Sequence, residues 1–122
     1  MFGVTQRSDL TALNIVNALL AAFLFLSPWI FGFGAVQAAA WNAWICGLLI
    51  VALAVAAVSA LHEWEEWVNG ALGLWTAAAP WILGFAGTAA ALWTHLGVGL
   101  AVAVLAAVEI WLIRENPPAQ TV

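Results

Sequence analysis

Long apolar runs, separated by short polar or glycine-containing segments, follow one another along most of the chain. Four of these runs are near the roughly 20 residues that a helix needs to cross about 30 Å of hydrocarbon, namely residues 10–31, 38–61, 67–83 and 89–113. Polarity does not alternate within them as it does in the strands of a transmembrane barrel. Because a chain in lipid must satisfy its backbone groups internally, this pattern predicts helices. We therefore expect an all-α integral membrane protein with four spans.

The segments between the runs divide the chain into two halves. Residues 32–37 join the first two runs, and residues 84–88 join the last two. A charged segment, His-Glu-Trp-Glu-Glu, separates the two pairs, and a tail with two adjacent prolines is expected to be flexible. The predicted organisation is a first two-helix unit at 10–61, a charged linker at 62–66, a second unit at 67–113 and a tail at 114–122.

The composition agrees with a membrane protein and argues against several other classes. Of the 122 residues, 66% are hydrophobic and 7% are charged, whereas a soluble domain carries about 25% charged residues. A soluble enzyme and a disordered chain are therefore poor interpretations. Two basic residues are too few for a nucleic-acid binder. The lone Cys46 has no second thiol with which to form a disulfide or a metal site.

A cleaved signal peptide is the alternative interpretation of the first run. Its apolar stretch from Leu10 to Leu26 is 17 residues long, which exceeds the length of about 7–15 residues that is typical of a signal. Residues 36–38 make only a weak cleavage site. We expect the first span to be retained, and an internal repeat supports that expectation.

The two halves match each other when the chain is shifted by 52 residues. Matches at Ala or Leu carry little weight in this composition, whereas Asn, Pro, Trp and Gly in the same order indicate a duplicated unit. Asn17 recurs as Asn69, and Trp41 recurs as Trp93. The recurring motif positions are Ser27, Pro28, Trp29 and Gly32 in the first copy and Ala79, Pro80, Trp81 and Gly84 in the second.

A Ser-Pro-Trp sequence that recurs within paired apolar spans resembles the SPW-repeat family of small membrane proteins. The resemblance covers residues 10–113 and departs from the family pattern at Ala79, where the family has Ser. It implies a four-helix integral membrane protein and no particular activity. Any role of the hydroxyl is therefore confined to the first copy.

Two spans in each unit make both units enter the membrane from the same side. The units are then parallel repeats about an axis along the membrane normal, unlike the inverted repeats of many transporters. Both termini and the charged linker lie on one side, together with Arg7 and Arg114. The positive-inside rule therefore predicts cytoplasmic termini in the plasma or inner membrane.

The two prolines are expected to end or kink their helices near the membrane surface. Proline removes one intrahelical hydrogen bond, and Ser27 is positioned to bond a carbonyl that Pro28 leaves free. The tryptophan after each proline is expected to anchor the helix at the interface. The glycine of each copy suits a left-handed C-terminal cap. A substrate or gating site at two broken helices is the alternative interpretation.

The intramembrane polar residues are Asn14, Asn17, Asn42 and Asn69. An unpaired amide in hydrocarbon is costly, so each is expected to bond to a neighbouring helix. Asn17 and Asn69 are related by the repeat and are expected at symmetric positions near its axis. In the alternative interpretation, the four amides form a polar stripe that lines an ion or substrate pathway.

The ionisable residues give no metal site by their spacing. His62 and His95 are predicted on opposite sides of the membrane, so they cannot ligate one metal in one subunit. Both are expected as solvated interfacial residues, although His95 remains open to a partner from outside. The acids of the linker are expected to form a solvated turn, and Glu109 is expected to snorkel to the membrane interface.

These observations favour a non-catalytic structural or accessory membrane component. Its expected partners are the lipid bilayer and a second copy or another membrane protein subunit, with no nucleic acid, metal or cofactor. The alternative function is a small-molecule or ion transport subunit, which requires an oligomer because one bundle has few polar lining residues. An enzyme is the third interpretation, and its only polar segment, 62–66, lacks a nucleophile.

Overall fold

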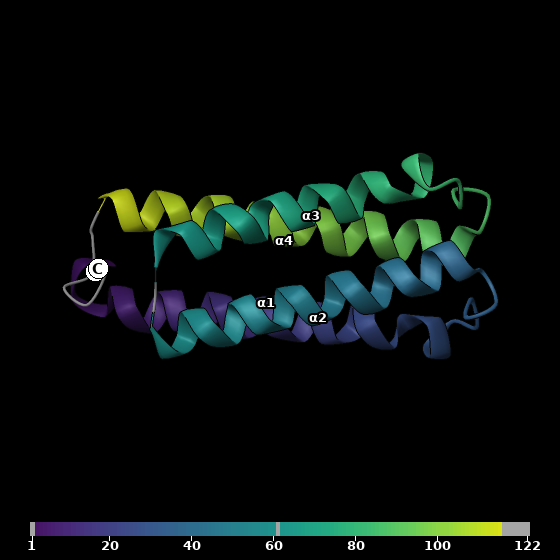
Figure 1. The fold of residues 1–122 in the computed structure, drawn as a ribbon. Coiled ribbons are helices and arrows are strands. Elements are labelled where there is room, and N and C mark those ends of the chain that lie inside the picture. Colours follow the sequence, from purple (N-terminus) through teal and green to yellow (C-terminus); the bar gives the residue numbers. More distant parts are fainter. Residues whose placement is uncertain (1, 61, 116–122) are drawn as a thin grey trace.

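The protein is a bundle of four helices in the computed structural model, which describes the backbone of residues 2–60 and 62–115 and the side chains of 9–60 and 62–115. The helices are α1 (Phe2–Ile30), α2 (Gln37–Ser59), α3 (Glu63–Ile82) and α4 (Ala89–Glu115). Helices α1 and α2 form one antiparallel hairpin, α3 and α4 form another, and the two hairpins lie side by side (Figure 1). The predicted all-α four-helix architecture is confirmed.

Three of the helices are long and apolar enough to cross a membrane. They are Asp9–Ile30 of α1, all of α2 and all of α4. Helix α3, which has three acids in its first turn, is not among them. Its 20 residues nevertheless extend about 30 Å, and it packs along α4 (Figure 1). In the bundle, α3 therefore covers a similar length to its neighbours.

Helices extend into the predicted linker and into the first two residues of the predicted tail. Residues 63–66 form the first turn of α3, where the backbone N–H of His62 donates to Glu65 Oε1 at 3.0 Å. This capping contact stabilises a helix start at Glu63, so the acids of the predicted linker belong to the first turn of α3. At the other end of the chain, Arg114 and Glu115 continue α4. The rest of the predicted tail lies outside the described residues.

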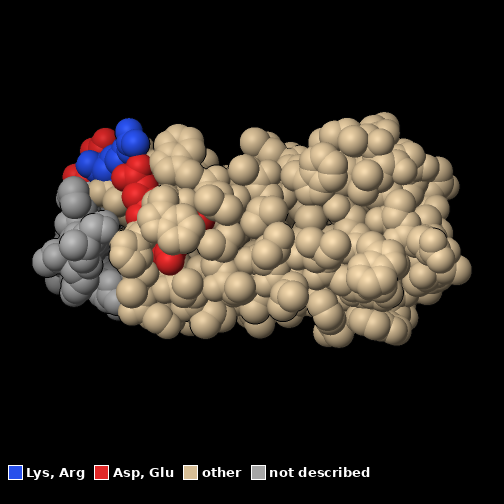
Figure 2. Space-filling view, viewed as in Figure 1, with Lys and Arg blue, Asp and Glu red and all other residues tan. Residues whose placement is uncertain are grey.

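The start of α1 and the end of α4 lie at the same end of the bundle as the connection between α2 and α3 (Figure 1). We call this end the linker end, and the opposite end, which holds the two hairpin turns, the loop end. Charged atoms on the face in Figure 2 gather toward the linker end. The arrangement agrees with two units that enter the bundle from one end.

Each hairpin has a point where its two helices approach closely, and the repeat relates these two points. A Cβ atom on Gly47 would lie 2.8 Å from the backbone oxygen of Ala21, and one on Gly99 would lie 2.6 Å from that of Gly73. A shift of 52 residues converts the first pair into the second. The duplicated sequence therefore reproduces one helix crossing, at which small residues let the backbones approach.

The hairpin turns begin with a left-handed glycine after each proline-containing helix. Gly32 has φ +73° and Gly84 has φ +82°. After α3, the N–H of Phe85 donates to the backbone oxygen of Pro80 at 2.8 Å, as in a Schellman motif. The prolines therefore lie in the last turns of their helices, and the predicted helix ends and glycine caps are confirmed.

Replacing Gly84 with alanine is expected to destabilise the second hairpin by about 1 kcal/mol, because an L-residue in the left-handed region meets its own carbonyl oxygen. The measurement is the midpoint of thermal unfolding in detergent, followed by tryptophan fluorescence. Gly87→Ala is the matched control, since Gly87 lies in the same turn, has no positive φ and has no atom within 4 Å of an added Cβ. Equal losses in the two variants would contradict the prediction.

Candidate functional site

The Ser-Pro-Trp motif closes the loop end of α1. Pro28 has no N–H to give to the backbone oxygen of Leu24, and the Ser27 hydroxyl donates to that oxygen at 2.6 Å. The predicted bond from Ser27 to a freed carbonyl is therefore confirmed. In the second copy, Ala79 occupies the equivalent buried position without a hydroxyl.

The motif tryptophans point outward. Trp29 is 62% exposed and Trp81 is 58% exposed, which suits the predicted role of interfacial anchors. Trp29 also packs on Trp44, with 5.3 Å between the ring centroids. The structure therefore gives the motif a local role in ending a helix, with Pro28 and Pro80 fully buried.

Ser27→Ala is expected to cost about 1 kcal/mol of stability, because it leaves a buried carbonyl without a partner. The midpoint of SDS-induced unfolding, measured by circular dichroism, tests this. Ser59→Ala is the control, since the Ser59 hydroxyl makes a similar bond to the Val55 oxygen at 3.1 Å on the exposed surface. The prediction fails if both substitutions have the same small effect.

A second polar site lies inside the bundle, toward the linker end. Each of its side chains is 1% exposed or less. The members of this polar cluster are Asn14 and Asn17 on α1, Glu66 and Asn69 on α3, and Glu109 on α4. It is the candidate functional site, because polar groups buried in a membrane protein are costly and mark functional positions.

The bundle geometry turns these side chains toward a common axis. Helices α1 and α3 each pack against α2 and α4, so α1 and α3 lie diagonally across the bundle. Asn14 and Asn17 are three residues apart, as are Glu66 and Asn69, and such pairs share a helix face. The shift of 52 residues also relates Asn14 to Glu66 and Asn17 to Asn69.

Direct contacts join three of the five members. The Asn14 amide donates from Nδ2 to Glu109 Oε1 at 2.6 Å and to the backbone oxygen of Leu10 at 3.0 Å. The carboxyl groups of Glu66 and Glu109 lie within hydrogen-bonding reach of each other. Two ionised carboxylates have no donor between them, so their close approach forms a bond only when one carries a proton.

Several polar atoms of the cluster lack a partner among the described residues. Both amide atoms of Asn17 and of Asn69 are unpaired, as is Oδ1 of Asn14. Both oxygens of Glu66 and Oε2 of Glu109 have no hydrogen-bond donor. Unpaired buried groups of this kind are rare and call for a bound water, ion or proton.

The structure corrects the prediction for the acids. Glu109 does not snorkel outward but is fully buried against Asn14. Glu65 and Glu66 are buried rather than solvated. The physical reason is the early start of α3 at Glu63, which places Glu66 on the same inward face as Asn69.

Glu63 alone among the acids of the linker behaves much as predicted. Its carboxylate accepts from Trp67 Nε1 at 2.9 Å and from Arg114 at 2.8 and 3.1 Å, at the surface of the linker end. The Trp67 indole and the Arg114 guanidinium hold the pKa of Glu63 below its usual range. Arg114 is thus engaged outside the polar cluster.

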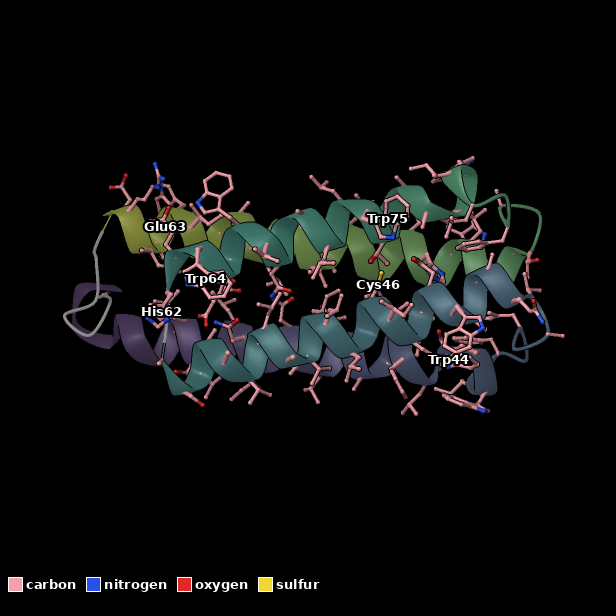
Figure 3. All side chains as sticks on the ribbon, in the orientation of Figure 1. Trp44, Cys46, His62, Glu63, Trp64 and Trp75 are labelled. Atoms are coloured by element: carbon pink, nitrogen blue, oxygen red, sulfur yellow. The ribbon has the colours of Figure 1, made fainter. Side chains whose placement is uncertain are left out.

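Asn42 lies apart from the polar cluster, near the start of α2 at the loop end. Its Oδ1 accepts from Trp75 Nε1 at 2.9 Å and from Cys46 Sγ at 3.5 Å. Figure 3 labels these two donor residues. The expected bond to a neighbouring helix is therefore present at Asn42 and at Asn14. Asn17 and Asn69 have no such bond among the described residues.

The two histidines lie at opposite ends of the bundle, as predicted. His62 precedes α3 at the linker end, where Figure 3 labels it, and His95 lies in the first turns of α4 at the loop end. The prediction of a solvated His95 is wrong. Its ring is fully buried, with Nδ1 2.8 Å from the Ala91 oxygen and its centroid 4.7 Å from that of Phe85. Within the described residues, no group of three His, Cys, Asp or Glu side chains is placed to hold a metal.

Comparison with known proteins agrees with the duplicated motif. The SPW repeat domain matches residues 11–109, which include both motif copies and the whole polar cluster. The chain belongs to the SPW repeat family. No curated protein and no solved structure matches it. Family membership and three membrane-capable helices together make this SPW repeat protein a membrane protein.

The sequence alone did not reveal the carboxyl pair. The sequence pattern places Glu66 in a solvated linker, and Glu109 lies only six residues before the end of α4. One signal was present, because Glu66 occupies the repeat position of the intramembrane Asn14. In this SPW repeat protein, the repeat therefore predicts that Glu66, like Asn14, lies inside the bundle.

Proposed function

We propose that this SPW repeat protein is a non-catalytic accessory component of a membrane, which packs its outer surface against lipid and another membrane-embedded chain. The observation that carries the proposal is the outward placement of its large aromatic side chains. The repeat-related Trp41 and Trp93 are 59% and 66% exposed. Tryptophan is enriched at membrane interfaces and at protein contact sites.

The short connections between helices support a role without catalysis. Residues 31–36 join α1 to α2, and residues 83–88 join α3 to α4. These turns are too short to build an active site of their own. Some of the buried polar side chains are used in contacts within the bundle, as Asn14 contacts Glu109 and Trp75 contacts Asn42.

Transport by an oligomer is the competing function, and the monomer gives it less support. The polar cluster and Asn42 do not form one stripe, because Leu24, Ile50 and Val102 are fully buried in the apolar core of the bundle. Asn14 and Asn42 also make their bonds within one chain. A polar pathway through an oligomer would need amides that face a neighbouring copy.

Two measurements separate these functions. In vesicles that contain the purified protein, we expect proton and potassium flux equal to that of protein-free vesicles. Flux that disappears in the Asn17→Leu variant would overturn the proposal in favour of transport. In native membranes, a photoreactive residue at Trp93 is expected to crosslink to a protein, whereas one at the buried Ile50 is not. Lipid adducts alone at Trp93 would also overturn the proposal.

We propose that this protein resides in the plasma or inner membrane. Its linker end then faces the cytoplasm. Support comes from Arg114, which lies at the linker end with the starts of α1 and α3 (Figure 1). Reporter fusions at both termini test the arrangement. We expect both reporters on the cytoplasmic side, and reporters on opposite sides would contradict the bundle topology.

A further inference from the structure

We infer that Glu66 and Glu109 hold one exchangeable proton between them, which makes the polar cluster a proton-binding site inside the bundle. The two carboxyl groups come from neighbouring helices, are fully buried and lie within hydrogen-bonding reach of each other. This inference goes beyond the accessory function, because it does not depend on what packs against the outer surface.

The charges around the pair require a proton rather than two ionised carboxylates. Two negative charges buried side by side repel strongly, and one of such a pair normally keeps its proton. The cation nearest in sequence, Arg114, is held by Glu63 at 2.8 Å at the surface. The buried Glu65 on α3 and the half-buried Asp9 on α1 are acids, so they add no positive charge.

The remaining faces of the site are neutral. In the described part of α1, the inward groups are the amides of Asn14 and Asn17. In α2, the titratable side chain is Cys46, which bonds to Asn42. His62, which precedes α3, lies 3.8 Å from Glu65 Oε2 and is directed to that acid. No described side chain that faces the pair therefore offers a positive charge in place of the proton.

Asn14 fixes where the proton can lie. Its Nδ2 group donates to Glu109 Oε1, so the other carboxyl oxygen, Oε2, is the one without a hydrogen-bond partner among the described residues. The oxygens of Glu66 are also without a donor. The structure thus assigns the proton to the bond between Glu109 Oε2 and one oxygen of Glu66.

Asn17 and Asn69 supply an independent observation. Both amides are buried on the inward face, one helical turn deeper than Asn14 and Glu66, and none of their four polar atoms has a partner among the described residues. Such groups stabilise water beside the carboxyl pair. Water at that position solvates the second negative charge when the proton leaves, which makes the proton exchangeable.

An apolar groove runs along the side of the bundle next to this site. It has a volume of about 400 Å³ and lies between α3 and α4, with Glu66 in its wall beside Gly70, Ala103 and Ala106. An apolar reagent that enters the groove from the surrounding lipid or detergent therefore lies next to Glu66, whose carboxyl oxygens face away from the surface. This placement provides the test.

The experiment is labelling of the intact protein in detergent with dicyclohexylcarbodiimide, read by mass spectrometry. A protonated carboxyl adds across one C=N bond of the reagent: its oxygen bonds to the central carbon and its proton goes to nitrogen. We expect one adduct, on Glu66 or Glu109, whose rate falls about tenfold per pH unit above the titration midpoint of the site. The double variant E66Q/E109Q is expected to lose the adduct, and the control Glu63→Gln is expected to keep it.

The outcomes that would overturn the inference are specific. They are an adduct that persists in E66Q/E109Q, a rate that does not depend on pH, or protection by sodium at constant pH, which indicates a metal-cation site instead. Infrared difference spectra of the unmodified protein measure carboxyl protonation directly and need no variant. They are expected to show a protonated carboxyl band that disappears on raising the pH, and its absence at every pH would also reject the site.

Discussion

Gly99→Leu is expected to separate α3 from α4 and to lower the stability of the bundle by at least about 3 kcal/mol. A Cβ at this position would lie 2.6 Å from the backbone oxygen of Gly73 and would also press on the backbone nitrogen of Ala77. Backbone atoms cannot rotate away as a side chain can, so the helices themselves must move. Helix association in lipid depends on this close packing, and the loss is therefore large.

The midpoint of SDS-induced unfolding, followed by tryptophan fluorescence, measures the effect. Gly97→Leu is the matched control, because Gly97 lies two residues earlier on the same helix and an added Cβ has no neighbour within 4 Å. Gly47→Leu should reproduce the loss in the first hairpin, where the Ala21 oxygen lies 2.8 Å away. If Gly99→Leu unfolds at the same SDS fraction as Gly97→Leu, the close crossing of α3 and α4 is wrong.

Asn14→Asp is expected to destabilise the bundle by about 3–5 kcal/mol at neutral pH, as breaking a buried polar pair does. The substitution removes the Nδ2 donor that lies 2.6 Å from Glu109 and places a third acid in the polar cluster. The new carboxyl ionises more readily in the unfolded chain than in the bundle. Stability therefore falls as the pH rises and recovers as the pH falls, when the aspartic acid can donate to Glu109 again.

Thermal unfolding in detergent over a range of pH tests this second prediction. Gln37→Glu makes the same chemical change at an exposed position at the start of α2 and is expected to have little effect. Asn14→Leu removes the donor without adding a charge, so its loss is expected to be smaller than that of Asn14→Asp at neutral pH. A pH-independent loss in Asn14→Asp would show that Asn14 does not face the carboxyl pair.

Local features of the fold could be predicted because local chemistry decides them. Pro28 and Pro80 lack an N–H, and Gly32 and Gly84 adopt a left-handed backbone, so the ends of α1 and α3 follow from the residues at those positions. Ser27 bonds the backbone oxygen that Pro28 leaves free for the same local reason. The wrong predictions concern residues whose surroundings come from other segments of the chain. His95, for example, is buried against Phe85 in the turn before α4 and lies near Phe33 in the turn of the other hairpin.

The sequence by itself determined that this chain is a duplicated, all-helical membrane protein, because apolar run length and a 52-residue repeat are properties of the order of residues. Only the tertiary structure decided what the acids do. Glu66 and Glu109 are 43 residues apart in the chain, and each alone is consistent with a solvated helix end. Packing of α3 against α4 brings them together and buries both away from bulk solvent, and in that low dielectric two neighbouring carboxyl groups become one site.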